Sequence, residues 1–469
     1  MTSIASVMWL KNGLFWAAHN RTARNRLRWT RASQRMMLMS WQSGLKSVKL
    51  SVLVALLIAP CAGHATTKSD QLEEMTPSVR IPVGPLGYMA PSAAYLSLRY
   101  ALTTVDFIDK DHLLFTYHVN HLLHRLPDEN GSDNDQMIHA VVVDIGNGKV
   151  TQQADWRMRD RQRYLWALND GEFLVRQRNS LFLTDEHLQL RPYLTFDTDL
   201  EALELSPDRK LMLLEIAKAE PAQPKTAPST GPSLLGPGSS VNDDVQDATE
   251  KKLTELLLVR PGDKTVVARS EAKHTVDLPL TDDGFIEQVQ GIEPNQWVLR
   301  KTNFTGKPKE FGFVRSTCVP TLQPLSETVV LTVHCSANRT LGNKSVTAIS
   351  TQDGTLWRNE WSDKYVWPDF AYAADGSRFA YESLAMDHPI GAMESFGEQD
   401  VKAQPVGVFD TDTGKLELVE NASPILSGGH NFALSADGQR FAILRGGEIE
   451  IYDLPPVPPV VKKGGKEKK

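Results

Sequence analysis

The sequence predicts an all-β protein, a single β-propeller of seven or six four-stranded blades that is closed by an N-terminal strand. One observation behind this prediction is a strand–turn–strand hairpin that recurs along the chain with similar turn residues. Another is a second hairpin that follows most copies of the first, so that each unit supplies four antiparallel strands. No amphipathic run long enough for a packed helix lies between the units, and a two-sheet sandwich does not explain so many four-strand units.

The first hairpin is clearest in two copies, residues 370–381 and residues 432–443, which are alike at nearly every position. In both copies a short strand leads through an Asp-Gly turn into a second strand. Glycine supplies the positive φ that such a turn needs, and the flanking apolar residues make both strands face a core. Weaker copies lie at residues 107–114, 168–174, 205–211, 293–299 and 325–331.

The second hairpin is recognised by another Gly-containing turn, as in residues 141–150 and 408–416. Together the two hairpins define blades at about residues 105–155, 163–196, 198–278, 285–316, 320–364, 367–421 and 428–454. The fourth unit is the least regular, which leaves six blades open. Because the last unit has only three strands, we expect residues 94–100 to close the ring as the outer strand of the last blade.

The turns resemble the TolB-like and WD40-like propeller repeats of exported bacterial proteins, whose turn reads Ser-Pro/Ala-Asp-Gly. The resemblance is carried by Ser206-Pro207-Asp208, Ala373-Ala374-Asp375-Gly376 and Ser435-Ala436-Asp437-Gly438, and it covers residues 105–454. The Gly-His and Trp-Asp pairs of true WD40 blades are absent. The resemblance implies a propeller fold and no particular activity, since propellers carry unrelated functions.

Residues 1–65 are expected to be an N-terminal extension with a signal peptide. They hold nine Lys or Arg and no Asp or Glu, and they end in an apolar run at residues 50–59 followed by Gly63-His64-Ala65. This pattern predicts secretion to the periplasm or the outside of the cell, with cleavage after Ala65. A run of ten residues is too short for a transmembrane helix. Lipid anchoring at Cys61 is not expected, because Pro60 stands where a small residue is required.

The remaining chain is expected to form one propeller with polar extensions. Residues 66–92 would be an extended lead-in and residues 93–455 the propeller. Residues 217–251, rich in Pro, Ser, Gly and Asp, would be a disordered insert in blade three. Residues 456–469 would be a disordered tail rich in Pro and Lys. Without residues 1–65 the chain has 42 basic and 57 acidic residues, and this acidic balance argues against nucleic acid as a partner.

Two cysteines, Cys318 and Cys335, remain after the predicted cleavage. Thiols of an exported protein meet an oxidising compartment, where two of them usually pair. Both cysteines lie at predicted strand ends of blade five, so antiparallel pairing could bring them within disulfide distance. We therefore expect a disulfide between them.

Candidate site residues are concentrated in three long connections, residues 118–138, 217–251 and 385–405. Each is predicted to join the second strand of a blade to the third, so all three should leave the ring on one face, where binding loops usually sit. His118, His121 and His124 are weak candidates for a metal site, because residues three apart on a strand point to opposite faces. The candidate binding rim consists of Asp128, Asp133, Asp387, His388 and Glu394.

No catalytic signature is found. The chain has no Gly-x-Ser-x-Gly motif, and the Gly/Trp turn typical of quinoprotein propellers occurs once, at residues 353–357. We therefore expect a monomeric, non-catalytic binding or scaffold module without a cofactor, whose partner is a protein or another envelope or extracellular ligand. The alternative is a propeller enzyme of lyase, hydrolase or quinoprotein type. That alternative requires acidic or histidine side chains from several blades to converge at the central channel.

Overall fold

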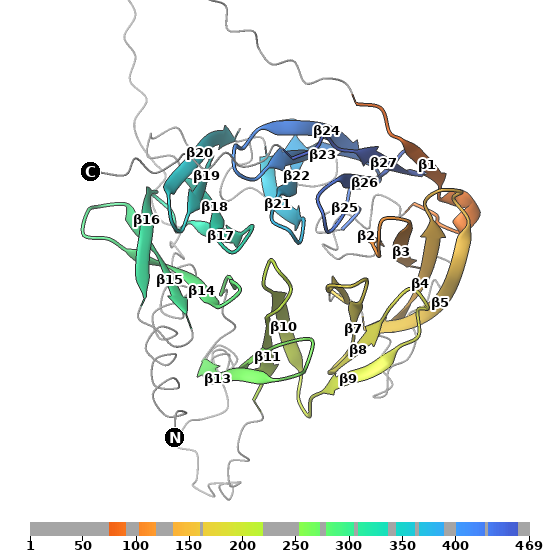
Figure 1. The fold of residues 1–469 in the computed structure, drawn as a ribbon, viewed down its shortest axis with the longest axis horizontal. Coiled ribbons are helices and arrows are strands. Elements are labelled where there is room, and N and C mark those ends of the chain that lie inside the picture. Colours follow the sequence, from red (N-terminus) through yellow and green to blue (C-terminus); the bar gives the residue numbers. More distant parts are fainter. Residues whose placement is uncertain are drawn as a thin grey trace, which may run out of the picture.

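Seven antiparallel sheets stand around a common centre (Figure 1). A computed structural model of the protein describes residues 75–90, 103–118, 135–159, 163–218, 253–272, 278–303, 308–335, 344–361, 365–388, 400–426 and 430–457. Each sheet is one blade of a propeller. The predicted fold class is confirmed, and of the two predicted blade numbers seven is correct.

The first three blades follow the chain in order. Blade one consists of β2 (Thr103–Phe107), β3 (His112–His118), β4 (Asp135–Asp144) and β5 (Val150–Arg159). Blade two consists of β6 (Leu165–Ala167), β7 (Phe173–Gln177), β8 (Ser180–Thr184) and β9 (Arg191–Thr195). Blade three consists of β10 (Leu200–Leu205), β11 (Met212–Ala217), β12 (Thr254–Val259) and β13 (Val266–Ala272).

The other four blades complete the ring. Blade four consists of β14 (Gly284–Gln290), β15 (Gln296–Asn303) and β16 (Lys309–Arg315). Blade five consists of β17 (Thr321–Pro324), β18 (Val329–Cys335), β19 (Lys344–Ser350) and β20 (Gly354–Trp361). Blade six consists of β21 (Tyr365–Tyr372), β22 (Arg378–Met386), β23 (Val401–Asp410) and β24 (Leu416–Ala422). Blade seven consists of β25 (Phe432–Leu434), β26 (Arg440–Arg445), β27 (Glu448–Asp453) and β1 (Val79–Pro82).

Blade four has a reduced inner strand that the sequence analysis did not recognise. Leu280 forms an isolated bridge with Phe285, and the Ile286 amide donates to the Pro279 carbonyl at 2.9 Å. The turn between this short inner segment and β14 is Thr281-Asp282-Asp283-Gly284, in which the Thr281 hydroxyl donates to Asp283 at 3.3 Å. A hairpin turn does lie at the start of residues 293–299, between β14 and β15, but its prediction as the first turn of the blade was wrong, because the short inner segment precedes β14.

The Ser-x-Asp turn of blade seven is repeated in blade three with one change. The Ser435 hydroxyl donates to Asp437 at 2.6 Å, and Gly438 follows with a φ of 64°. In blade three the Ser206 hydroxyl donates to Asp208 at 2.7 Å, but the glycine position is taken by Arg209, with a φ of 59°. A long side chain is strained in this left-handed conformation, so Arg209 carries a backbone cost that glycine avoids.

The ring is closed by β1, which pairs antiparallel with β27 and makes blade seven four-stranded. The prediction that an N-terminal strand closes the ring is confirmed, but the choice of residues 94–100 was wrong. The strand β1 lies within the segment that was expected to be an extended lead-in. A 3-10 helix, η2 (Gly84–Leu86), follows it.

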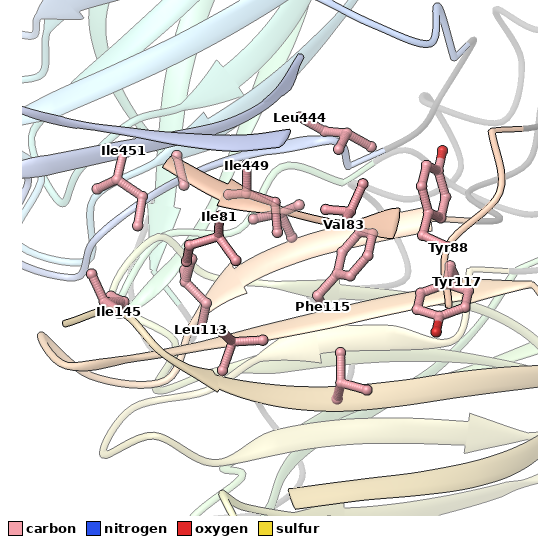
Figure 2. Close-up of a cluster of buried hydrophobic side chains, with 14 residues drawn as sticks. Ile81, Val83, Tyr88, Leu113, Phe115, Tyr117, Ile145, Leu444, Ile449 and Ile451 are labelled. Carbon is pink, nitrogen blue, oxygen red and sulfur yellow. The ribbon is translucent and has the colours of Figure 1, made fainter. Parts of the chain in front are cut away.

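The core lies between neighbouring blades. At the closure, buried apolar side chains of β1, β3, β27 and the segment after β1 form one cluster (Figure 2). Ile81 is 0% exposed and Val83 1% exposed, so β1 adds two fully buried side chains to this seam. Burial of one such side chain stabilises the fold by about 1.5–3 kcal/mol.

A buried arginine, paired with a glutamate within blade six, joins blade six to blade seven. The Arg378 side chain is fully buried, and its Nε donates to Glu417 Oε2 at 2.5 Å. Its Nη1 donates to the Gly438 carbonyl at 2.8 Å, and its Nη2 donates to the carbonyl of Pro455 beyond β27. One guanidinium therefore holds a turn of blade seven and the segment that leaves the sheet.

The predicted disulfide between Cys318 and Cys335 is confirmed, with a Cα–Cα distance of 5.6 Å. It ties the connection between blades four and five to the end of β18. The Ser316 hydroxyl reinforces the link, because it donates to the Cys318 carbonyl at 2.5 Å and accepts the Cys335 amide at 3.1 Å. In the part of the chain that is described, no helix has the length and apolarity needed to cross a membrane.

Candidate functional site in the central channel

Most of the site residues predicted on the long connections lie outside the described residues: His121, His124, Asp128, Asp133 and Glu394. His118 is the last residue of β3 and is half-buried. The three long connections join the second and third strands of blades one, three and six, as predicted. The binding rim itself remains a prediction.

Asp387 and His388 follow β22, and His388 Nδ1 lies 2.5 Å from Asp387 Oδ1. With Asp400 they offer three ligand atoms within 4.8 Å of one another, and Asp109, His112 and Glu186 form a second group of this kind. Three ligands match the number that an open zinc site uses. However, Asp109 already accepts the backbone amides of Asp111 and His112, which is the ordinary role of an aspartate in a turn.

The structure brings a different set of polar side chains together, in the central channel. A cavity of about 250 Å³ lies on the inner edges of all seven blades. Its wall includes residues of β2, β6, β10, β17, β21 and β25, and also Pro279 and Leu280 from the short inner segment of blade four. Ionisable side chains from five blades line it: Asp106, Arg163, Glu204, Arg209, Asp369, Tyr372 and His430.

Sequence reasoning missed these residues, although the repeat contains a signal for some of them. In each blade an amide near the end of the inner strand closes the first turn, as in Ile108, Ser206 and Leu325. Two residues earlier the inner strand carries Asp106, Glu204 and Gln323, in the order of those blades. An alignment of blades on the turn places these polar residues at one position, which faces the channel.

Asp106 is the acid of blade one, on β2. Burial in the channel wall raises its pKa to about 7, although Arg163 and Arg209 favour its charged form. The same desolvation lowers the pKa of Arg209, an effect that Tyr372 and Asp106 oppose. A carboxyl group with this pKa changes its charge near neutral pH, where an isolated aspartate stays ionised.

His430 precedes β25 and faces blades one and six. Its backbone bridges Thr104 of β2, and its Nδ1 lies 4.0 Å from Asp369 Oδ2 on β21. Burial and the nearby Arg163 lower the pKa of His430 to about 4, and Asp369 opposes this only in part. The imidazole is therefore neutral at physiological pH and offers one donor and one acceptor.

A buried polar network lies behind this pair, in the seam between blades six and seven. The Gln404 side chain donates to Asn431 at 3.1 Å and accepts from it at 3.0 Å. Glu382, which is 1% exposed, stands opposite Asp369 in the sheet. Burial and, to a smaller extent, the charge of Asp369 raise the pKa of Glu382, a hydrogen bond with Gln404 lowers it, and the net result is a pKa of about 9. Glu382 is therefore a neutral acid at pH 7.

No protein-family model matches the chain. No curated protein matches it either. The expected TolB-like membership thus remains a prediction.

Solved structures similar to the chain include propellers of several kinds. The uncomplexed acylaminoacyl peptidase of Pyrococcus horikoshii is 10% identical, with a TM-score of 0.44 over 78% of this chain and 54% of the peptidase. The propeller domain of the Trilobed protease from Pyrococcus furiosus is 9% identical, with a TM-score of 0.39 over 75% and 95% of the two chains. A chain of the Mitotic Checkpoint Complex is 9% identical, with a TM-score of 0.41 over 87% and 100%.

This chain spans about half the length of the peptidase chains that it matches. At these identities nothing beyond the fold carries over, and the assignment of the fold rests on the seven sheets themselves.

Proposed function

We propose that this protein is an exported binding propeller whose ligand site is the central channel. The observation that carries the proposal is the convergence of ionisable side chains from blades one, two, three, six and seven on one cavity of about 250 Å³. A concave site with a few convergent polar groups on a rigid scaffold is the usual form of a small-molecule site. The ligand is a small polar molecule, or one polar group of a larger envelope component.

Export is supported by two features of the chain. Residues 1–65 have the composition of a secretory leader. The Cys318–Cys335 disulfide suits an oxidising compartment such as the periplasm or the cell exterior. Expression of the full chain in a bacterial host and sequencing of the recovered protein test this: a mature N-terminus at Thr66 is expected, and a cytosolic protein that starts at a translational Met contradicts it.

The channel is tested by filling it. Gln323 lines the cavity and is half-buried, so Gln323→Trp should occupy the ligand volume. Gln352→Trp is the matched control, because Gln352 is exposed in the turn between β19 and β20. A small-molecule library is screened by ligand-observed NMR against the mature protein. The hits should bind the parent and the control and lose binding to Gln323→Trp, provided that all three proteins melt cooperatively. Equal binding to all three proteins refutes the channel site.

Asp106 favours a second candidate function, acid–base catalysis of lyase type in the same channel. An acid whose pKa is about 7 exchanges protons efficiently near neutral pH. If a ligand from the screen is converted, Asp106→Asn should abolish conversion and preserve binding. Unchanged turnover by that variant excludes this role for Asp106.

A further inference from the structure

Two arginines and one tryptophan of the channel wall have hydrogen-bond donors that no acceptor among the described residues satisfies. Arg163 is exposed, its Nε donates to the Leu165 carbonyl at 3.2 Å, and its guanidinium lies 5.3 Å from the centre of the Trp166 ring. Arg209 donates from Nη1 to the Leu168 carbonyl at 2.9 Å. Among the described residues neither guanidinium forms an ion pair. Each guanidinium has five N–H donors, so most of them remain for a ligand.

Trp166 adds a further donor. Its side chain lines the cavity and is only 4% exposed, yet its indole N–H meets no acceptor in the described part of the protein. A buried donor without a partner destabilises the folded protein. An acceptor atom of a bound ligand would remove this cost.

The backbone conformation of Arg209 also supports a ligand site in the channel. Arg209 occupies the turn position that Gly438 fills in blade seven, and it adopts the left-handed conformation there. Strained residues of this kind are concentrated at functional sites. Arginine is strained at this position, but it supplies a guanidinium to the channel wall, which glycine would not.

The carboxyl groups of the wall do not neutralise these cations by direct contact. Asp106, the acid that both arginines influence, is only partly ionised near pH 7. Asp369 accepts the Phe370 amide at 2.9 Å and lies beside His430. Glu204 is half-buried on β10 and has an interaction of its own. The full chain has a net charge of −6, so the two arginines are not part of a general basic surface.

We propose that the channel selects a small oxyanion, a carboxylate or a phosphate, that bridges Arg163 and Arg209 and accepts the indole N–H of Trp166. The proposal rests on the channel being the ligand site. Arginine forks match the planar pairs of oxygens in carboxylates and phosphates, and such charge-assisted bonds are about twice as strong as neutral ones.

Anion binding is expected to take up a proton. A bound anion disfavours the charged form of Asp106, so the pKa of Asp106 rises in the complex. Arg163, Arg209 and Thr104 act on Asp106, as does Tyr164, whose pKa burial raises far above neutral. His430 lines the same cavity, and burial lowers its pKa to about 4. Affinity should therefore fall as the pH rises above about 7.

The experiment is calorimetry of the mature protein with four probes. Succinate and inorganic phosphate are the two anions, and they distinguish a carboxylate from a phosphate ligand. 1,4-Diaminobutane and 1,4-butanediol have the same carbon chain as succinate, with positive charge or none. Titration of the parent and of Asp106→Asn at pH 6 and pH 8, in buffers of different ionisation enthalpy, measures the proton uptake that Asp106 contributes, apart from any protonation of phosphate itself. We expect one of the anions to bind, more tightly at pH 6, and neither of the other probes to bind.

Three variants separate recognition from folding. Arg163→Gln should weaken binding of the anion by about 10-fold or more. Arg209→Gly should do the same and yet melt no lower than Arg209→Gln, because glycine suits the left-handed backbone. Arg191→Gln is the control, since Arg191 is exposed on β9 and lies away from the cavity.

Binding of the diamine or the diol in place of the anions overturns the proposed selectivity and leaves the channel site standing. Anion binding that survives Arg163→Gln and Arg209→Gly also overturns it. So does the failure of both anions to bind at millimolar concentration. The channel site itself fails only if the NMR hits bind Gln323→Trp as they bind the parent.

Discussion

The carboxyl group of Glu382 is a buried acid in the seam between blades six and seven. It stands on β22 beside the Gln404–Asn431 pair, and one of its oxygens has no hydrogen-bond partner in the described structure. Desolvation is the largest reason that its pKa reaches about 9. Ionisation of Glu382 would place an uncompensated charge between blades six and seven, close to Asp369.

Glu382 should therefore make the protein less stable as the pH rises. Between the ordinary value of 4.5 and about 9, the unfolded chain loses this proton and the folded protein keeps it, so each rise in pH favours unfolding. Glu382→Gln keeps a neutral side chain of similar shape that does not titrate. The stability of the variant relative to the parent should increase across this range, by up to about 1.4 kcal/mol per pH unit.

Thermal melts of both proteins from pH 5 to pH 9 check this prediction. His430, whose lowered pKa acts at the acid end, is present in both proteins and cancels in the difference. Parallel curves of melting temperature against pH would show that Glu382 ionises freely in the folded state.

Single residues of the site were the part that sequence reasoning could not reach. Asp106 and Glu204 share a repeat position, so an alignment of blades could have found them. Arg163 and His430 each stand five residues before the amide that closes the first turn, that of Leu168 or Ser435, so the same alignment relates them. Both lie ahead of the inner strand, in connections of irregular length where the repeat is hard to follow. In the sequence, Arg209 was visible only as the residue that replaces glycine in the Ser-x-Asp turn of blade three. That its side chain lies on the channel wall can be seen only in the assembled propeller.

At the scale of elements, the strands were predicted well where the turns have strong chemistry. Blades six and seven carry Asp-Gly turns, and their predicted inner hairpins coincide with β21–β22 and β25–β26. Blade four was misread because its inner strand is a single bridge and leaves no alternating pattern. The closing strand was misread because β1 is only four residues long, and residues 94–100 alternate more clearly.

The strand β1 should contribute more stability than its length suggests. Ile81→Ala removes a fully buried side chain from the seam between blades seven and one and should cost about 2–5 kcal/mol. Arg80→Ala changes the neighbour, whose side chain is 56% exposed and pairs with Glu448 at the surface. Its other partner, the buried Glu450, keeps Arg445 and Tyr452, so the change should cost about 1 kcal/mol. Urea unfolding of both variants measures the difference. Equal, small losses for both would mean that the ring does not depend on β1.

The Cys318–Cys335 disulfide is a second local feature that should stabilise the propeller. Replacing both Cys318 and Cys335 by serine frees a 17-residue loop in the unfolded chain and should cost about 3 kcal/mol on the chain-entropy model. The hydrogen bonds of Ser316 are expected to keep the native geometry. A thiol titration of the unfolded, unreduced parent should find no free thiol. Two reactive thiols per chain would disprove the bond in solution.

At the scale of the whole molecule, the channel exists because every blade sends its innermost strand to the same axis. Side chains that lie hundreds of residues apart, such as those of Asp106 and His430, meet there without any local sequence relation. This explains why the sequence predicted the number and order of blades and yet assigned the candidate site to the long outer connections. It also explains why the two proposals are tested by variants on different blades.

The closure by β1 has a mechanical consequence. Val79 pairs with Ile451 and Pro82 with Glu448, so the chain enters β1 and leaves β27 at the same end of the pair. A force that pulls the two ends of the domain apart would load the backbone hydrogen bonds one after another, as in the opening of a zipper. Strands pulled lengthwise share a load, whereas strands peeled from one end do not. The ring should therefore open first between β1 and β27, and at low force. This is expected even though the cluster beside this strand pair holds some of the most deeply buried side chains in the protein.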